Sequence, residues 1–235
     1  MADPGNRPGK LVALCGSDGT GKETQTRRLA QRAGEAGWSV ETVSFPRYGQ
    51  GFFADLIERY LRGDFGASPV DVSPYMASLP YAGDRWQAAP RVRDWLTAGR
   101  LVIANRYVPA NMAHQGAKLP DAEERRAFYA WDEELEYRVM QLPRPDVQVL
   151  LSLPVEVSAQ LLRQRSRQTE GGELDIHERD LDYLAATTRA YHEVARQTTG
   201  PWVEVRCVAA GRLRSRDAIA ADLWDAVRAV IGEPV

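Results

Sequence analysis

Short apolar runs alternate with longer segments of helical character along the chain. We expect strands at 10–15, 39–45, 101–104, 147–153 and 202–207, and helices at 24–36, 52–61, 74–96, 121–140, 155–167, 181–197 and 216–231. The run at 101–104 is entirely apolar, as in a strand that is buried on both faces. Strands that alternate with helices predict an α/β fold with a parallel sheet covered by helices on both sides.

The chain is expected to form one domain. Residues 1–9 are polar and contain two prolines and two glycines, which predicts a disordered lead-in. From 10 to 235 there is no internal repeat and no linker-like segment, so we interpret this range as a single domain.

Charge and composition narrow the classes of function. The 235 residues carry a formal charge of −2, so no polybasic signature points to nucleic acid or to an anionic membrane. No apolar run approaches the roughly 20 residues of a membrane span. Cys15 and Cys207 each end a predicted strand without metal-ligand spacing, which favours buried thiols in a reducing, cytoplasmic setting.

A glycine-rich segment between the first strand and the first helix carries most of the functional information. Residues 16–24 read Gly-Ser-Asp-Gly-Thr-Gly-Lys-Glu-Thr. They fit the phosphate-binding pattern G-x-x-x-x-G-K-[ST] except at Glu23. A strand, a glycine turn and a helix start let backbone N–H groups converge on an anion, and Lys22 adds a mobile charge. We expect ATP to bind at Gly16, Ser17, Asp18, Gly19, Thr20, Gly21, Lys22, Glu23 and Thr24.

Arginines recur just after the predicted strands and the helix at 155–167. In a parallel sheet, ligands sit beyond the carboxyl ends of the strands. Arg47 follows the second strand and Arg106 the third, whereas Arg163, Arg165 and Arg167 lead into a flexible break at 169–173. Because Arg binds phosphate oxygens bidentately, these sites suit more than one phosphate group.

These motifs, taken together and in this order, resemble the thymidylate kinase family of P-loop nucleoside monophosphate kinases. The further segments that carry the resemblance are 45–49 (FPRYG), 81–86 (YAGDRW), 105–118 (NRYVPANMAHQGAK), 142–146 (LPRPD) and 175–178 (DIHE). The resemblance implies a doubly wound five-stranded sheet of order 2-3-1-4-5 with a lid at about 163–180. It also implies transfer of the γ-phosphoryl group of ATP to dTMP, a Mg²⁺ cofactor and a homodimer.

The resemblance assigns roles to matching residues around the acceptor nucleotide. Asp18 would accept a hydrogen bond from the 3′-hydroxyl with support from Tyr48, and Arg47 and Arg106 would hold the acceptor phosphate. The base would be bound by Tyr81, Arg85 and Asn111, and His114 would crowd the 2′ carbon of the sugar. Tyr81 and Arg85 are one helical turn apart, which suits stacking plus an edge contact. Trp86 is expected to pack between helices.

The family takes its catalytic arginine either from the phosphate loop or from the lid. Here the loop has Thr20 and no arginine, so the closing cation is assigned to Arg163, Arg165 or Arg167, with Gly171 and Gly172 giving the lid its flexibility. Lys22 and Arg106 complete the catalytic set.

Two residues depart from the family pattern near the expected magnesium. Glu23 replaces the usual hydroxyl residue, and Asn105 replaces the Asp that usually precedes the Arg-Tyr pair. We hypothesise that Glu23 holds the metal directly or through water and that Asn105 orients a metal-bound water. The alternative for Glu23 is a favourable interaction with the helix dipole.

Two other functions remain open. A kinase of another pyrimidine monophosphate would use the same scaffold, and a regulatory nucleotide-binding protein with impaired catalysis would explain Glu23 and Asn105. His177 and His192 lie far along the chain without metal-ligand spacing, so no role is assigned to them.

Overall fold

The computed structural model describes residues 8–168 and 176–234, with the side chains of Arg165, Arg167, Gln168 and Arg179 left undescribed. Within these ranges the central sheet contains five strands: β1 (Lys10–Cys15), β2 (Val40–Ser44), β3 (Leu101–Asn105), β4 (Val147–Ser152) and β5 (Trp202–Arg206). Their order is β2-β3-β1-β4-β5 and every neighbouring pair is parallel. The predicted doubly wound sheet is confirmed.

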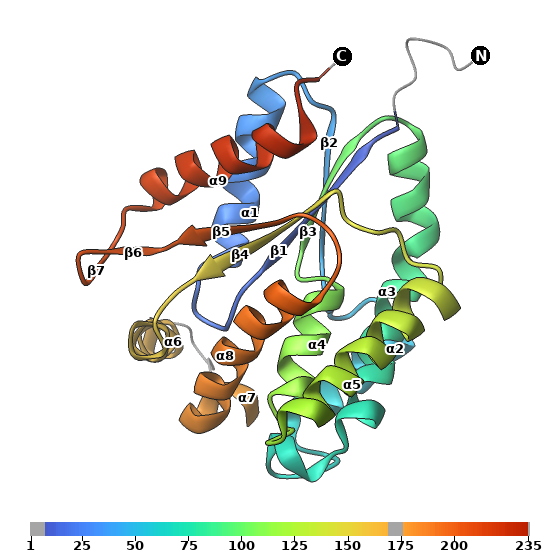
Figure 1. The fold of residues 1–235 in the computed structure, drawn as a ribbon, viewed down its shortest axis with the longest axis vertical. Helices are drawn as coiled ribbons and strands as arrows, with labels where there is room; N and C mark the ends of the chain where they lie inside the picture. The colour runs from blue at the N-terminus through green and yellow to red at the C-terminus, as the bar shows by residue number, and fades with distance from the viewer. Residues whose placement is uncertain (1–7, 169–175, 235) are drawn as a thin grey trace.

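Helices cover both faces of this sheet (Figure 1). They are α1 (Lys22–Glu35), α2 (Phe52–Arg62), α3 (Pro74–Thr97), α4 (Val108–Gly116), α5 (Ala122–Glu133), α6 (Val155–Gln168), α7 (Ile176–Arg179), α8 (Leu181–Gln197) and α9 (Arg216–Ile231). Two short helices, η1 (Pro69–Asp71) and the π-helix η2 (Glu134–Val139), and two short strands, β6 (Val208–Ala209) and β7 (Arg212–Leu213), complete the described part.

The central strand β1 shows why the sheet needs two layers of helices. Successive side chains of a strand point to opposite faces. Leu11 and Ala13 pack in one buried cluster with residues of α3, α4, α5 and α8. Val12 and Leu14 pack in a second cluster with α1 and α9. Because β1 is buried on both faces, the loop that follows it begins in the middle of the molecule.

The fold differs from the sequence prediction in several places. No helix was expected between the strand at 101–104 and the helix at 121–140, but α4 forms there, and Pro109 sits in its first turn, where a missing N–H costs nothing. The helix expected over 121–140 ends as an α-helix at Glu133 and continues as η2. The chain between β5 and α9 folds back as the antiparallel β6–β7 hairpin.

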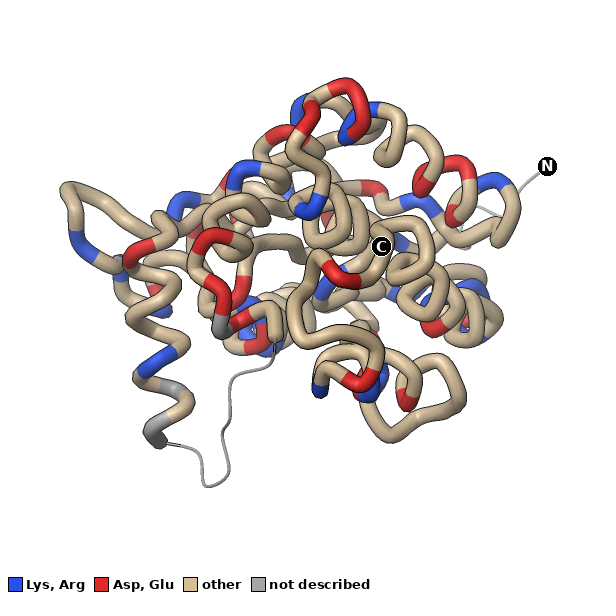
Figure 2. Tube along the Cα trace, turned by 90° about the horizontal axis from the view of Figure 1, so that it is seen from below, with Lys and Arg blue, Asp and Glu red and all other residues tan. Residues whose placement is uncertain are grey.

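Charged residues of both signs are interspersed along the trace (Figure 2), in keeping with the charge of −2. Among the described residues, no helix combines the length and the apolar content that a membrane crossing demands.

Candidate active site

A cavity of about 910 Å³ lies at the edge of the sheet where the carboxyl ends of the strands meet. Its lining includes residues at or just beyond the ends of β2, β3, β4 and β5, together with the glycine-rich loop after β1. This volume falls in the range of small-molecule sites. Ligand binding at this edge is the expectation for an open parallel sheet.

The loop after β1 has a backbone that only glycine adopts readily. Gly16 and Gly19 have φ of 147° and 81°. A Cβ added to Gly16 would lie 2.7 Å from the carbonyl oxygen of Leu151, and one added to Gly19 would lie 2.8 Å from that of Ser158. Both glycines are therefore required by conformation and by space.

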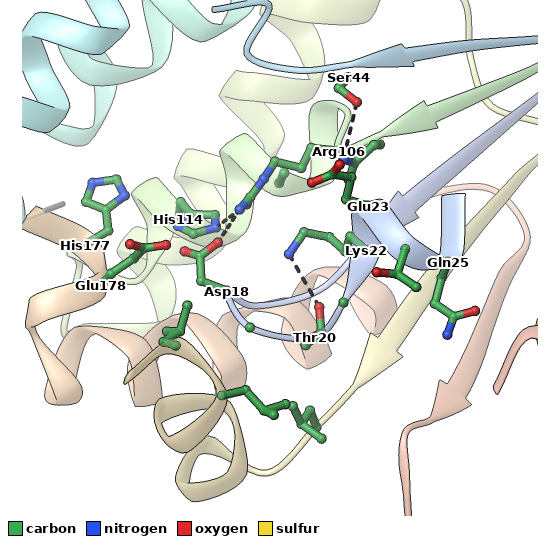
Figure 3. A pocket seen from close by; sticks show the side chains of 18 of the residues that line it. Asp18, Thr20, Lys22, Glu23, Gln25, Ser44, Arg106, His114, His177 and Glu178 are labelled. Carbon is green, nitrogen blue, oxygen red and sulfur yellow. Dashed lines mark hydrogen bonds and ion pairs between the residues drawn. The ribbon is translucent and has the colours of Figure 1, made fainter. Parts of the chain in front are cut away.

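Lys22 begins α1 and folds back over this loop (Figure 3). Its Nζ donates to the carbonyl oxygens of Gly16 at 2.9 Å and Ser17 at 2.8 Å, and to Oγ1 of Thr20 at 3.4 Å. Although Lys22 is only 6% exposed, it lines the cavity. A buried ammonium beside backbone amides gives the loop the positive potential that a polyphosphate requires.

Asp18, Arg106 and His114 form a linked group at the floor of the cavity (Figure 3). Nη2 of Arg106 pairs with Asp18, and its Nη1 lies 3.0 Å from Nε2 of His114. Burial opposes ionisation of Asp18, yet Arg106, through its charge and its hydrogen bond, acts together with the other positive neighbours to hold the pKa of this carboxyl well below its usual range. Arg106 itself has a φ of 65°, a strained value for a residue with a side chain.

A second group of buried charges closes the far end of the cavity. Arg85 makes a bidentate pair with Glu136, with both N–O distances at 2.5 Å and side-chain exposures of 2% and 0%. The amide nitrogen of Asn111 donates to Glu136 and Asp132 at 3.0 Å. Burial and the charge of Glu136 raise the pKa of Asp132 well above its usual value. Oδ1 of Asn111 is buried without a hydrogen-bond partner among the described residues.

Tyr81 lines the cavity one turn before Arg85, as its place in the sequence predicts. Its ring meets that of Tyr60 edge-on, at 6.4 Å between centroids and 88° between planes. Trp86, expected to pack between helices, is instead 53% exposed, because its position on α3 faces away from the sheet.

Three comparisons with known proteins point to one family. The family model described as "Thymidylate kinase" matches residues 15–207. Thymidylate kinase from Mycobacterium tuberculosis is 35% identical over 190 residues, covering 81% of this chain and 87% of that protein. The human thymidylate kinase is 26% identical over 196 residues, covering 83% and 81%.

The chain belongs to the thymidylate kinase family. A solved structure of thymidylate kinase from Candida albicans superimposes with a TM-score of 0.67 over 94% of this chain and 92% of that one. At 21% identity this structure bears on the fold alone.

The two departures from the thymidylate kinase pattern lie at the same rim of the cavity. The Glu23 side chain is 84% exposed, and its Oε1 lies 3.4 Å from Nη2 of Arg27. Nδ2 of Asn105 donates to Oγ of Ser44 at 3.3 Å, while its Oδ1 is buried without a partner among the described residues. An orphaned amide oxygen and a nearby carboxylate are oxygen donors of the kind that Mg²⁺ takes. No group of three His, Cys, Asp or Glu side chains that could hold a metal occurs within the described ranges.

Arg47 and Tyr48 lie in the segment that follows β2 and have different surroundings. Tyr48 lines the main cavity with about half of its surface exposed. Arg47 lines a neighbouring cavity and pairs with Asp84, with Nε of Arg47 2.9 Å from Oδ1. The backbone N–H of Arg47 donates to the other carboxylate oxygen of Asp84, also at 2.9 Å. The thymidylate kinase resemblance did not indicate this buried partner.

The predicted lid falls partly outside the described residues. Gly171 and Gly172 lie outside them, as do the side chains of Arg165 and Arg167. Arg163 is exposed on α6, whereas Leu161, Leu162 and Gln164 line the cavity. Residues of a helix are spaced by about 100°, so position 165 falls on the arc that these three residues share, and position 163 falls opposite.

Sequence reasoning missed two cavity residues beside His114. Gln115 is fully buried, and both atoms of its amide lack a hydrogen-bond partner among the described residues. Gln115 follows His114 inside 105–118, a segment that carried the resemblance. The signal that could have marked it is a polar residue within an otherwise largely apolar helix. His177, set aside for its distance along the chain, lines the same cavity beside His114 (Figure 3).

The opposite end of the cavity was missed altogether. It is lined by residues of α1 and of the segment that leads from β5 into α9: Gln25, Cys207, Leu213, Arg214, Arg216 and Ile219. Gln25 donates to the carbonyl oxygen of Arg216 at 3.2 Å, which ties α1 to the start of α9. Nothing in the spacing of these residues marks them as neighbours.

Proposed function

We propose that this chain is a thymidylate kinase that converts ATP and dTMP into ADP and dTDP. The observation that carries the proposal is one continuous cavity, with a phosphate-binding loop in its middle and a buried guanidinium–amide group at one end. An oxygen of the dTMP phosphate forms a bond to the γ-phosphorus, and the bond between that phosphorus and the β–γ bridging oxygen breaks. ADP leaves with the bridging oxygen.

The acceptor base would lie between Tyr81 and the Arg85–Asn111 group. Arg85 stays charged because Glu136 offsets the cost of its burial and raises its pKa above the ordinary value. It therefore donates to a base carbonyl, and the orphaned Oδ1 of Asn111 accepts from a ring N–H. Thymine offers both groups on one edge, whereas cytosine lacks the ring N–H. Buried polar groups left without partners make the wrong base costly.

The sugar and phosphate would lie over the Asp18–Arg106 pair. Asp18 is ionised and accepts a hydrogen bond from the 3′-hydroxyl, with Tyr48 beside it. Arg106 holds the acceptor phosphate, and Arg47 assists from its place on Asp84. His114 occupies the space beside the 2′ carbon and so disfavours ribonucleotides.

ATP would bind across the loop with its phosphates on Gly16–Lys22 and its base toward the β6–β7 hairpin. Phosphoryl transfer needs positive charge around the moving group more than covalent help. We assign the closing cation to Arg165, because its position on α6 shares the cavity-facing arc with Leu161, Leu162 and Gln164. Arg163 and Arg167 then contribute to the potential of the lid.

Magnesium would be held mainly by the ATP phosphates and water, because hard cations take oxygen ligands and Mg²⁺ keeps several waters. Glu23 and Asn105 supply the protein's oxygens, directly or through water. The ion supplies neutralising charge on the phosphates when bound.

We also propose a homodimer that works in the cytoplasm. Met76, Leu79 and Trp86 share one face of α3 and are 62%, 37% and 53% exposed, a stripe that suits a second copy of the chain. Cys15 and Cys207 are free, and burial raises the pKa of their thiols to about 12 and about 11, which suits a reducing compartment.

An ADP-release assay with ATP and Mg²⁺ tests the proposed activity. It compares kcat/KM for dTMP, dUMP, dCMP, dGMP and UMP, and dTMP should be the best acceptor. Acceptors that lack a required hydrogen bond should fall by as much as ~10⁴-fold. A purine or a ribonucleotide at the top would overturn the assignment, and no turnover with any acceptor would favour an impaired regulatory protein.

A further inference from the structure

His177 joins three helices around the acceptor end of the cavity. It is 5% exposed and comes from the short helix α7. Its ring stacks on that of His114 from α4, at 5.6 Å between centroids and 19° between planes. Its Nε2 lies 3.0 Å from the hydroxyl of Tyr60, a buried residue of α2. Tyr183, at the start of α8, donates from its hydroxyl to the carbonyl oxygen of His114 at 2.6 Å.

The hydrogen bond on the other side of the stack has only one possible direction. A guanidinium cannot accept a hydrogen bond, so Nη1 of Arg106 donates and Nε2 of His114 accepts. His114 is therefore neutral and carries its proton on Nδ1. That Nδ1–H is buried without a partner among the described residues, so the ring orientation depends on Arg106 and on the stack.

Burial keeps both rings neutral. Burial lowers the pKa of His114 to about 3; the charge of Asp18 opposes this shift, and the charges of Arg106, Lys22 and Lys118 add to it. Burial also lowers the pKa of His177 well below its usual value; His114, Lys118 and Arg106 add to this shift and Asp18 opposes it. Two neutral imidazoles stack without charge repulsion, so the contact persists at physiological pH.

We propose that His177 is a positioning residue for the acceptor nucleotide: its ring holds His114 in the orientation that accepts from Arg106. Arg106 is thereby fixed over Asp18, where the acceptor phosphate and the 3′-hydroxyl are bound. The inference rests on the proposed function, because those ligands define the acceptor site. It also connects the acceptor site to α7.

A residue that only fills space would behave differently. Loss of packing lowers the free energy of unfolding but leaves the KM for dTMP and the protonation of His114 unchanged. Loss of positioning raises the KM for dTMP more than it lowers kcat, because a displaced Arg106 already weakens binding of the acceptor before the phosphoryl group is transferred. The two roles therefore give different results in the same variant.

The experiment uses the full chain with two changes at one position. His177→Phe keeps a stacking ring but loses the bond to Tyr60, and His177→Ala loses both. His192→Ala on α8 is the matched control, since it removes the histidine to which no site is assigned. Kinetics with saturating ATP give kcat and the KM for dTMP. ¹⁵N spectra of the imidazole rings report the proton on Nδ1 of His114 without any turnover, and with three histidines in the chain they can be assigned by subtraction.

The expected result follows from the size of the contacts. One aromatic contact plus one buried hydrogen bond corresponds to roughly a tenfold effect. His177→Ala should raise the KM for dTMP about tenfold with less than a threefold fall in kcat, and it should shift the ¹⁵N signals of His114. His177→Phe should raise the KM about threefold and leave the His114 tautomer as it is.

Unchanged KM and unchanged His114 signals in His177→Ala would overturn the proposal, whether or not the variant is less stable. If His177→Ala fails to fold, Tyr60→Phe removes the same hydrogen bond from the other side and should match His177→Phe. If Tyr60→Phe and His177→Phe had additive effects on the KM for dTMP, this would count against a linked set of contacts from Tyr60 through His177 to His114. If the wild type fails to phosphorylate dTMP, the proposed function falls, while the spectra still decide whether His177 orients His114.

Discussion

The two ends of the cavity are built in different ways. At the acceptor end, Arg85 and Glu136 are almost fully buried and bonded to each other, and Asn111 joins them. On the donor side, Arg163 is exposed on α6 and the Glu23 side chain is 84% exposed on α1. Buried, paired groups are fixed before a ligand arrives, whereas surface charges can move with their helix. The acceptor end is therefore suited to selecting the nucleotide, and the donor side to supplying charge during transfer.

The largest effect should come from removing charge on the donor side. Arg165→Ala should lower kcat by roughly 10³-fold or more, as for other arginines at this transition state. Its thermal midpoint should stay close to that of the wild type, because the role assigned to Arg165 is in phosphoryl transfer and not in packing. Single-turnover kinetics with dTMP would measure the loss, with Arg163→Ala as the comparison for a smaller one. Equal falls in kcat in Arg165→Ala and Arg163→Ala would contradict the assignment of the closing cation to Arg165.

Breaking the acceptor pair should instead cost stability. Glu136→Gln keeps the size of the side chain but leaves the buried charge of Arg85 without its partner, which should lower the free energy of unfolding by about 3–5 kcal/mol. Urea unfolding gives this value directly. Glu134→Gln is the matched control, since it breaks an i,i+4 pair with Arg138 whose side chains are 49% and 72% exposed. That control should cost no more than about 0.5 kcal/mol.

Acid should destabilise the protein through His114. Its pKa is lowered to about 3 in the folded chain, by burial and by the cations around it, against about 6.5 when unfolded. Between these values the unfolded state binds the proton and the folded state does not, so the free energy of unfolding falls as the pH falls below about 6.5. His114→Gln should flatten this fall by about 1–2 kcal/mol between pH 7 and pH 5. Urea unfolding at several pH values would show it, and the same acid dependence in wild type and variant would contradict it.

The smallest effect should appear at Glu23, on the rim of the cavity. If Glu23 replaces the charge that Asn105 lacks, Glu23→Gln should raise the Mg²⁺ concentration for half-maximal rate, and adding Asn105→Asp should restore it. The two changes should couple by more than the ~0.5 kcal/mol typical of independent sites. Arg27→Gln breaks the surface pair of Glu23 but keeps its carboxylate, so it should leave the Mg²⁺ dependence unchanged. A Mg²⁺ dependence that Glu23→Gln does not alter would leave only a helix-start role for this residue.

Local features of the sequence predicted the sheet and the phosphate loop. The apolar runs gave all five strands of the sheet to within two residues. The loop was predictable because its determinants are local. Gly16 and Gly19 adopt positive φ, Lys22 bonds to the carbonyl oxygen of Gly16, and all three lie within seven residues. Such signals depend on neighbours along the chain, which a single sequence displays.

Contacts between distant segments could not be predicted in this way. The partner of Arg85 is Glu136, 51 residues further on, and no periodicity connects them. His177 was set aside on spacing alone, although the fold brings it against His114. Arg47 was matched to a phosphate role, and its pair with Asp84 became visible only when α3 was packed beside the chain after β2. The donor-base end depends on a hairpin of two-residue strands, too short to leave a pattern.

The π-helix η2 has a consequence for the length of this part of the chain. Met140 donates to the carbonyl oxygen of Leu135, five residues back, so the turn holds one residue more than an α-helical turn. Each residue of an α-helix accounts for about 100° of rotation. The wide turn thus lets Glu136 face inward while the chain still leaves in phase for Leu142 and β4. Substitution is tolerable where the turn is open, as at Val139, which is 61% exposed, but deletion of a single residue would rotate Glu136 and the exit relative to each other. The amino acids of this segment are therefore less constrained than the number of residues in it.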